Sequence, residues 1–169
     1  MIYFLYGLAG AGKSYVGRVI AEQYGYHFWE GDDALTPEMR QCLTTGQSFT
    51  QKMRDEFSEK LEKEIYALQQ QINKPLIIAQ GLYKQKNRDK LKQAFPNIHF
   101  VQITADWPVI AKRLESRKSG MTVTYATAAA KFFEPGEEKQ IDNNPNQDLL
   151  QQLQTLLGPL PELQTTVNY

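Results

Sequence analysis

Eight residues near the N-terminus carry the strongest chemical signal in the sequence. They match the pattern G-x-x-x-x-G-K-[ST] in full and read Gly7, Leu8, Ala9, Gly10, Ala11, Gly12, Lys13 and Ser14. The glycines let successive backbone N–H groups face one anion, and a helix that begins near Lys13 adds its positive end. Lys13 is suited to the β and γ phosphates of ATP, and the Ser14 hydroxyl to Mg²⁺. We therefore predict that residues 7–14, with the adjoining Tyr15, bind ATP and Mg²⁺.

A group of carboxylates follows the second predicted strand. Glu30, Asp32 and Asp33 fall where a parallel sheet would bring them near the phosphate loop. A carboxylate there can take the proton of an acceptor hydroxyl or bind Mg²⁺ through water. We favour Asp32 for both roles, partly because Gln80 stands where an acidic residue would end the strand at 76–79. The alternative is an acidic turn that only caps a helix.

Two arginines lie late in the chain, before a flexible Ser-Gly break. Arg113 and Arg117 are four residues apart, so on one helix they would share a face. Guanidinium groups beside a hinge can close over ATP and stabilise charge on the phosphoryl group in transfer. The alternative is a solvated basic face.

Strands alternate with helices along the chain. Short apolar runs predict strands at 2–6, 26–29, 76–79 and 98–103, with a weaker one at 139–142. Helical spacing predicts helices at 13–24, 37–46, 49–72, 84–95, 106–118, 123–133 and 147–157. This order indicates an α/β fold: a mostly parallel five-stranded sheet with helices on both faces. We predict one domain over 1–169, a mobile lid at about 118–133 and a loosely held tail at 158–169.

Composition narrows the class of protein. Lys plus Arg and Asp plus Glu each number 19, so a nucleic-acid-binding role is not favoured. The single cysteine, Cys42, allows no intrachain disulfide. No stretch has the length and hydropathy of a membrane helix or signal peptide, and we expect a cytoplasmic protein without a membrane partner.

Several motifs together resemble the small P-loop kinases of the gluconate kinase and shikimate kinase group, gluconate kinase above all. The similar stretches, in order, are GLAGAGKS, FWEGDDALTP, TGQSFTQKMRDEF, QGLYKQKNRDKL, RLESRKSG and FFEPGEE. The resemblance implies a three-layer P-loop kinase fold and transfer of the ATP γ-phosphoryl group to a hydroxyl of a sugar acid such as gluconate. It also implies residue roles: Asp32 as base, Arg54 and Arg88 near the acceptor, Arg113 near the nucleotide and Arg117 at the phosphates.

Two departures from the family pattern lie on the acceptor side. Thr36 stands where the family has a histidine, with one extra residue in the spacing, and Tyr83 is an additional residue after the third strand. The acceptor is therefore left open among a sugar acid, shikimate, a nucleoside and a nucleic-acid 5′ end. A nucleotide-binding regulator without transfer activity is a further alternative, and a homodimer is one possible assembly. In each enzymatic case the partner is a hydroxyl acceptor, and an anionic small molecule is favoured.

Overall fold

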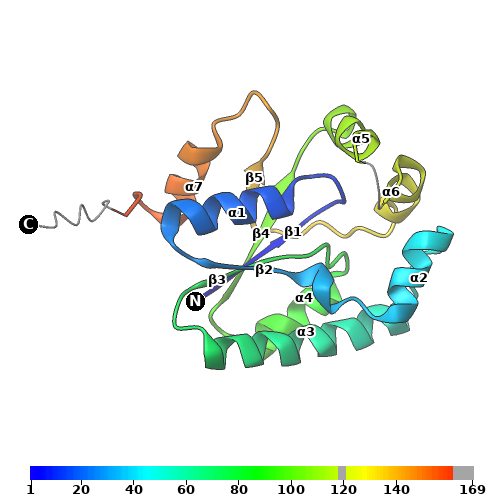
Figure 1. The fold of residues 1–169 in the computed structure, drawn as a ribbon, viewed down its shortest axis with the longest axis horizontal. Helices are drawn as coiled ribbons and strands as arrows, with labels where there is room; N and C mark the ends of the chain where they lie inside the picture. The colour runs from blue at the N-terminus through cyan, green and yellow to red at the C-terminus, as the bar shows by residue number, and fades with distance from the viewer. Residues whose placement is uncertain (118–120, 162–169) are drawn as a thin grey trace, which may run out of the picture.

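The computed structural model describes residues 1–117 and 121–161, and its elements alternate as the sequence predicts (Figure 1). The strands are β1 (Ile2–Tyr6), β2 (His27–Glu30), β3 (Leu76–Ala79), β4 (Ile98–Thr104) and β5 (Lys139–Asp142). The helices are α1 (Lys13–Tyr24), η1 (Gly31–Ala34), α2 (Pro37–Thr45), α3 (Gln51–Gln71), α4 (Gln85–Ala94), α5 (Trp107–Glu115), α6 (Val123–Ala130) and α7 (Leu149–Leu157).

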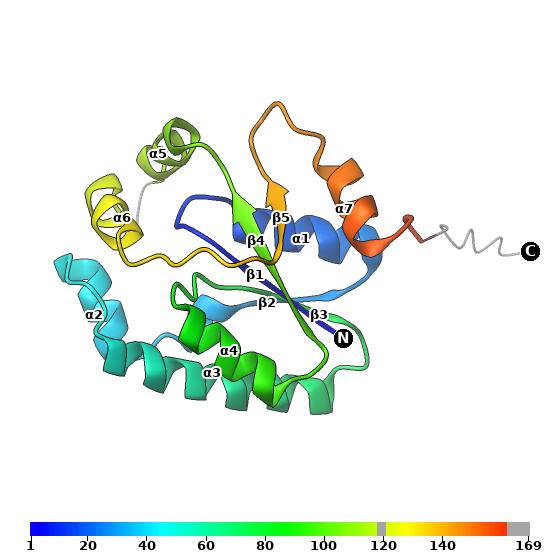
Figure 2. The ribbon, with the colours of Figure 1, turned by 180° about the vertical axis from the view of Figure 1, so that it is seen from behind.

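In the described residues the strands form one five-stranded sheet in the order β2-β3-β1-β4-β5. Every pair is parallel, which confirms the predicted sheet. Helices α1 and α7 lie on one face, and α3 and α4 lie on the other (Figures 1 and 2). Because all strands point the same way, their carboxyl ends meet at one edge, where a ligand site is expected.

The central strand β1 is buried on both faces. Phe4 and Tyr6 pack in the core beneath α3 and α4, whereas Leu5 packs in the core beneath α1. Successive side chains of a strand point to opposite faces, so an unbroken apolar run fits this position. Helix α3 covers this face of the sheet, since Phe57 and Leu61 are buried in the first of these cores.

Local capping explains where several helices begin. Thr36 Oγ1 accepts a hydrogen bond from Met39 N at 3.2 Å, so α2 begins at Pro37, the predicted first residue of this helix. Thr50 Oγ1 accepts from Met53 N at 3.2 Å, so α3 begins after Thr50 and not at Phe49. Helix α1 ends at Gly25 with φ 70°, a left-handed conformation that favours glycine.

Two predicted helices are shorter than expected. Helix α5 ends at Glu115, although the sequence suggested an end near 118, and α6 ends at Ala130. Residues 118–120 of the predicted lid and 162–169 of the predicted tail lie outside the described residues. The early end of α5 matters for the site, because Arg113 lies on this helix whereas Arg117 lies after its end.

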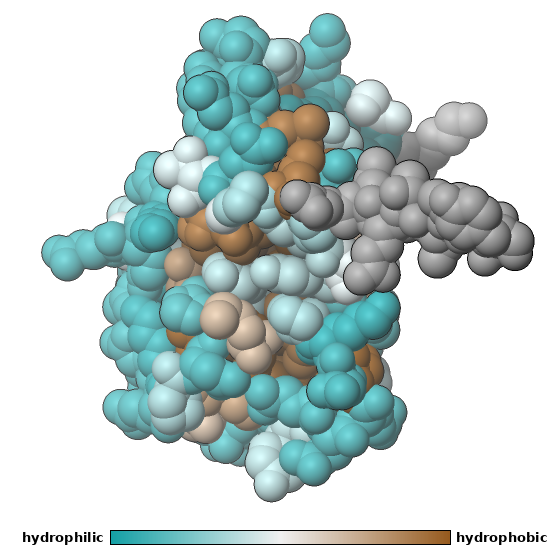
Figure 3. Space-filling model, turned by 90° about the vertical axis from the view of Figure 1, so that its left-hand side faces the viewer, coloured by the Kyte–Doolittle hydropathy of each residue, from teal (hydrophilic) through white to brown (hydrophobic). Residues whose placement is uncertain are grey.

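The end of the molecule near the N-terminus is mainly hydrophilic, with smaller apolar areas between elements (Figure 3). The opposite end holds the carboxyl ends of the strands together with α2, α5 and α6 (Figure 1). In the described part of the chain, no helix combines the length and hydropathy that crossing a membrane requires.

Candidate active site

The loop between β1 and α1 has backbone angles that glycine adopts readily. Gly7 has φ 144°, Gly10 has φ 81° and Gly12 has φ 96°. A Cβ at Gly7 would collide with the Ile103 carbonyl oxygen, and one at Gly12 would collide with the Asn143 amide. These glycines therefore meet both a conformational and a packing requirement. The result is a tight turn that leads directly into the N-terminus of α1.

Lys13 begins α1, and its side chain folds back along the loop. Its Nζ donates hydrogen bonds to the carbonyl oxygens of Gly7 at 3.1 Å and Leu8 at 2.9 Å. Burial lowers the pKa of Lys13 to about 8, with the Arg117 charge adding to the shift and the charges of Asp32 and Glu30 opposing it. Lys13 is thus a desolvated cation, and a nearby anion would stabilise its charged form.

This lowered pKa predicts a pH dependence of nucleotide binding. A bound triphosphate stabilises the charged ammonium, so affinity is full below pH 8 and falls as the pH rises above that value. We expect the dissociation constant of a non-hydrolysable ATP analogue to rise by up to about tenfold per pH unit above pH 8. Calorimetry between pH 7 and 9 measures this dissociation constant. Lys13→Met should bind the analogue weakly, and its affinity should not change with pH over this range. A constant affinity across that range would contradict the prediction.

A cavity of about 480 Å³ opens at the carboxyl edge of the sheet. Its walls bring together five predicted site residues from distant parts of the chain: Lys13, Ser14, Asp32, Arg54 and Arg117. Ala9, Gly10, Gly12 and Tyr15 of the predicted nucleotide-binding set also line it. The volume lies within the range of small-molecule sites, which is about 300–1,000 Å³.

Glu30 is nearer to Ser14 than the sequence suggested. Ser14 Oγ donates to Glu30 Oε2 at 2.6 Å, and Arg18 lies 4.0 Å from the same oxygen. Burial raises the pKa of Glu30, and the neighbouring charge of Asp32 raises it further, while the Ser14 hydrogen bond lowers it. The position of Glu30 at the end of β2 could have indicated this contact with the phosphate loop. The sequence analysis nevertheless favoured Asp32.

These residues suit Mg²⁺ bound with phosphates. Among the described residues no three His, Cys, Asp or Glu side chains form a cluster that could hold a metal ion. Mg²⁺ keeps several waters and commonly uses one or two carboxylates with substrate phosphates, so a dedicated cluster is not required. The Ser14 hydroxyl and the Glu30 carboxylate already lie side by side. The donor set therefore fits a phosphate-associated Mg²⁺.

Asp32 lies in the short helix η1 directly after β2. Gln80, at the end of β3, donates from Nε2 to Asp32 Oδ1 at 3.3 Å. The other end of the same amide, Oε1, accepts from Leu82 N at 2.6 Å. Gln80 thus orients the Asp32 carboxylate. The sequence analysis had noted only that Gln80 stands where an acidic residue would be expected.

The two late arginines have different surroundings. Arg117 lines the cavity. Arg113 turns towards the phosphate loop, where it donates to the Ala11 carbonyl oxygen at 3.1 Å and to the Asn143 carbonyl oxygen at 2.6 Å. The structure therefore gives Arg113 a supporting position behind the loop, while Arg117 faces the ligand space.

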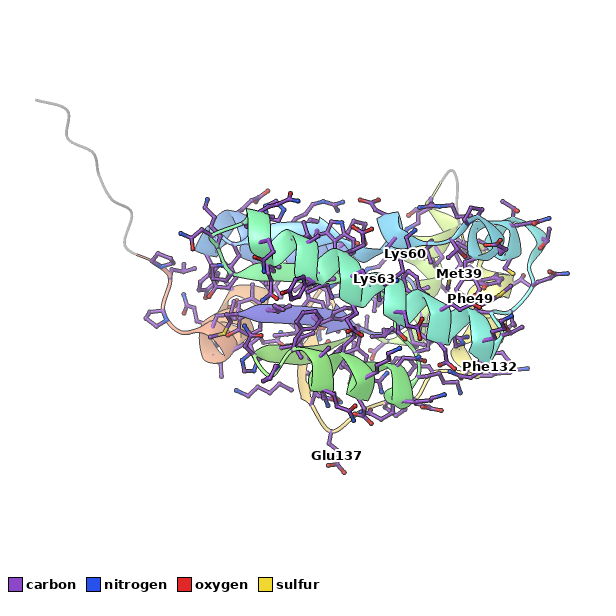
Figure 4. The ribbon with its side chains drawn as sticks, turned by 90° about the horizontal axis from the view of Figure 1, so that it is seen from below. Met39, Phe49, Lys60, Lys63, Phe132 and Glu137 are labelled. Atoms are coloured by element: carbon purple, nitrogen blue, oxygen red, sulfur yellow. The ribbon has the colours of Figure 1, made fainter. Side chains whose placement is uncertain are left out.

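Arg54 extends from α3 into an aromatic group. Its guanidinium carbon lies 5.6 Å from the ring centre of Phe49, 5.8 Å from that of Tyr83 and 5.9 Å from that of Phe132. Phe49 and Phe132 lie at the same end of the molecule, near Met39 of α2 (Figure 4). Within residues 1–117 and 121–161, the Arg54 guanidinium has no hydrogen-bond or ion-pair partner and contacts only aromatic rings, so its charge is available to a ligand anion.

Arg88 was predicted to bind the acceptor, but the structure places it outside the cavity. It is fully buried and does not line the cavity. Its guanidinium donates to the carbonyl oxygens of Leu82 at 2.8 Å and Glu134, and its carbon lies 4.3 Å above the Tyr6 ring. Arg88 therefore holds two loops together beside the cavity instead of facing an acceptor. The sequence could not show this, because a charged residue in a polar helix is usually exposed.

A phosphate loop at the carboxyl edge of a parallel sheet, with its lysine and serine facing a cavity, defines a P-loop nucleotide-binding protein. A family model described as shikimate kinase matches residues 9–152, and the chain belongs to that family. It is an ATP-dependent phosphotransferase that acts on a hydroxyl group.

Curated relatives and solved structures agree with this class. The thermoresistant gluconokinase of Escherichia coli is 29% identical over 140 residues, which cover 82% of this chain and 79% of that protein. A gluconokinase structure from Sinorhizobium meliloti is 26% identical with a TM-score of 0.73, covering 90% of this chain and 86% of the other. A sugar kinase from Janibacter sp. shares the fold, with a TM-score of 0.79, 22% identity and coverage of 92% and 91%.

Proposed function

We propose that this protein transfers the γ-phosphoryl group of ATP to a hydroxyl of a sugar acid such as gluconate. The observation that carries the proposal is one cavity lined both by the phosphate loop and by Arg54, whose guanidinium has no polar partner among the described residues. The gluconokinases among its relatives support a sugar acid as the acceptor. Apolar side chains that line the same cavity, including Leu35, Met39 and Phe57, would pack against the carbon chain.

Each side chain has a defined task in this reaction. Asp32 accepts the proton as the acceptor hydroxyl oxygen attacks the γ phosphorus in line with the bond that breaks, and ADP leaves. Lys13 and Arg117 stabilise the charge that spreads over the phosphoryl oxygens. Mg²⁺ bound at Ser14, with Glu30 or Asp32, would neutralise the β and γ phosphates. Arg113 supports the phosphate loop from behind.

The segment around α6 would act as the lid. Met121, Tyr125 and Ala129 line the cavity, so this helix forms part of its wall. Closure over both ligands would exclude water, which otherwise competes as phosphoryl acceptor.

An acceptor panel tests the proposed function. ADP formation and phosphate transfer are measured with sugar acids, shikimate, nucleosides and 5′-hydroxyl oligonucleotides. We expect a phosphorylated sugar acid as the main product. Transfer to a different acceptor alone would overturn the substrate, and nucleotide binding without transfer to any acceptor would indicate a regulator.

Arg54 is predicted to decide affinity for the acceptor. Arg54→Met should raise the acceptor KM about 10- to 100-fold, because a hydrogen-bonded charge pair to the acceptor anion is lost. The KM for ATP should change less than about threefold, since the phosphates are expected to bind at residues 7–14 and not at Arg54. Lys52→Met is the matched control, because Lys52 is an exposed cation of the same helix. Equal effects on both KM values would contradict an acceptor-side role.

A further inference from the structure

Tyr83 occupies an unusual position between the phosphate loop and the acceptor end of the cavity. Its hydroxyl accepts a hydrogen bond from Ala9 N at 3.1 Å, and its ring lines the cavity. The same ring lies beside the Arg54 guanidinium and packs edge-on against Phe133, with ring centres 5.3 Å apart. One side chain therefore touches both halves of the site.

The peptide unit between Leu8 and Ala9 places the Tyr83 hydroxyl relative to Lys13. The carbonyl of this unit accepts from Lys13 Nζ at 2.9 Å, and its N–H donates to Tyr83 at 3.1 Å. The lysine that serves the β and γ phosphates and the tyrosine hydroxyl thus flank the same peptide unit. Since one lone pair of the hydroxyl is used by Ala9, its proton is directed to another acceptor.

A strained turn holds Tyr83 in this place. Leu82 has φ 35°, and among the described residues it is the only one other than glycine with a positive φ. The Leu82 N–H donates a hydrogen bond to Gln80 Oε1, and the Leu82 carbonyl oxygen accepts one from the Arg88 guanidinium. The Tyr83 carbonyl oxygen accepts a third from Glu134 N at 2.9 Å. Strained backbone persists where its surroundings over-determine it, and it gathers at functional sites. The strain and the three hydrogen bonds together aim the ring at the phosphate loop.

We infer that the Tyr83 hydroxyl donates a hydrogen bond to the γ-phosphoryl group and positions it for transfer, an inference that rests on the proposed phosphotransfer. The donor is neutral and fixed, and its bond strengthens as charge builds on the phosphoryl oxygens. The ring also separates the acceptor anion at Arg54 from the phosphates. Tyr83, one of the two departures from the family pattern, thereby takes a place at the reacting centre.

The protonation state of Tyr83 agrees with a donor role. Burial raises the pKa of the Tyr83 hydroxyl, and the charge of Asp32 adds to this, whereas the Ala9 hydrogen bond and the Arg54 charge lower it. Because the net direction is upward, the hydroxyl keeps its proton near neutral pH.

Tyr83→Phe tests the inference because it removes the hydroxyl and keeps the ring. The dissociation constants of Mg-ADP and of the β,γ-imido analogue of ATP are compared by calorimetry, together with kcat. We expect ADP affinity to stay within about twofold, analogue affinity to fall about tenfold and kcat to fall at least about tenfold. Tyr66→Phe, at an exposed position of α3, is the control and should change neither constant.

Other outcomes overturn the inference. Equal weakening of ADP and analogue would mean that the hydroxyl only shapes the loop, and no change in either would remove any role. The Ala9 amide resonance of the unmodified protein gives a second readout, which the analogue should shift more than ADP does. Equal shifts with both would also overturn the inference. These binding measurements need no acceptor, so failure of the sugar-acid panel does not affect them.

Discussion

Lys13→Ala is expected to lower kcat/KM for phosphotransfer by at least about 10³-fold. The variant removes the cation that would meet the β and γ phosphates, and no other lysine lines the cavity among the described residues. The loss should appear both in kcat and in the KM for ATP, because the ammonium would contact the phosphates in the bound nucleotide and in the transition state. Initial rates of ADP formation with a saturating acceptor measure the effect.

Stability provides the control for this variant. Among the described residues, Lys13 Nζ donates hydrogen bonds only to the main-chain oxygens of Gly7 and Leu8, and its desolvation lowers its pKa to about 8. Its removal should therefore leave the thermal midpoint unchanged or slightly raised. Near-normal turnover by a folded Lys13→Ala protein would count strongly against the mechanism.

Asp32→Asn is expected to lower kcat by about 10²- to 10⁴-fold, the range for loss of a general base. Asparagine has the same shape and its oxygen can still accept from Gln80, so the local geometry should persist. It cannot take the proton of the acceptor hydroxyl. Affinity for Mg-ADP should change little, because Ser14 and Glu30 stay in place.

Asp33→Asn is the matched control for Asp32→Asn. Asp33 is the next residue of η1, is exposed and does not line the cavity. Its variant should keep kcat within about twofold, as is usual for a surface change away from the site. If both variants lose activity equally, the effect belongs to the turn and not to a base at Asp32.

Short-range patterns in the sequence predicted most of the fold. The apolar run of β1, the glycines before Lys13 and the start of a helix at Pro37 each depend on residues a few positions apart, and the structure confirms all three elements. Boundaries were less accurate, since the ends of α5 and α6 depend on packing against other segments. The five-stranded parallel sheet followed from the alternation of strands and helices.

Side-chain roles away from the phosphate loop could not be predicted in the same way. The sequence favoured Arg88 for the acceptor, but the tertiary structure buries it against Tyr6 and the Leu82 and Glu134 carbonyls. It also treated Glu30 as secondary, whereas the structure joins it to Ser14. These outcomes depend on segments tens of residues apart, which local patterns do not relate.

The sequence by itself determined that this chain has a phosphate loop between a buried strand and a helix, because that motif carries its chemistry within eight consecutive residues. Only the tertiary structure decided which side chains share a cavity with that loop. Asp32, Arg54, Tyr83 and Arg117 come from four separate segments and line one cavity. The physical reason is that parallel strands bring the loops at their carboxyl ends to one edge, while burial and hydrogen bonding set the direction of each side chain.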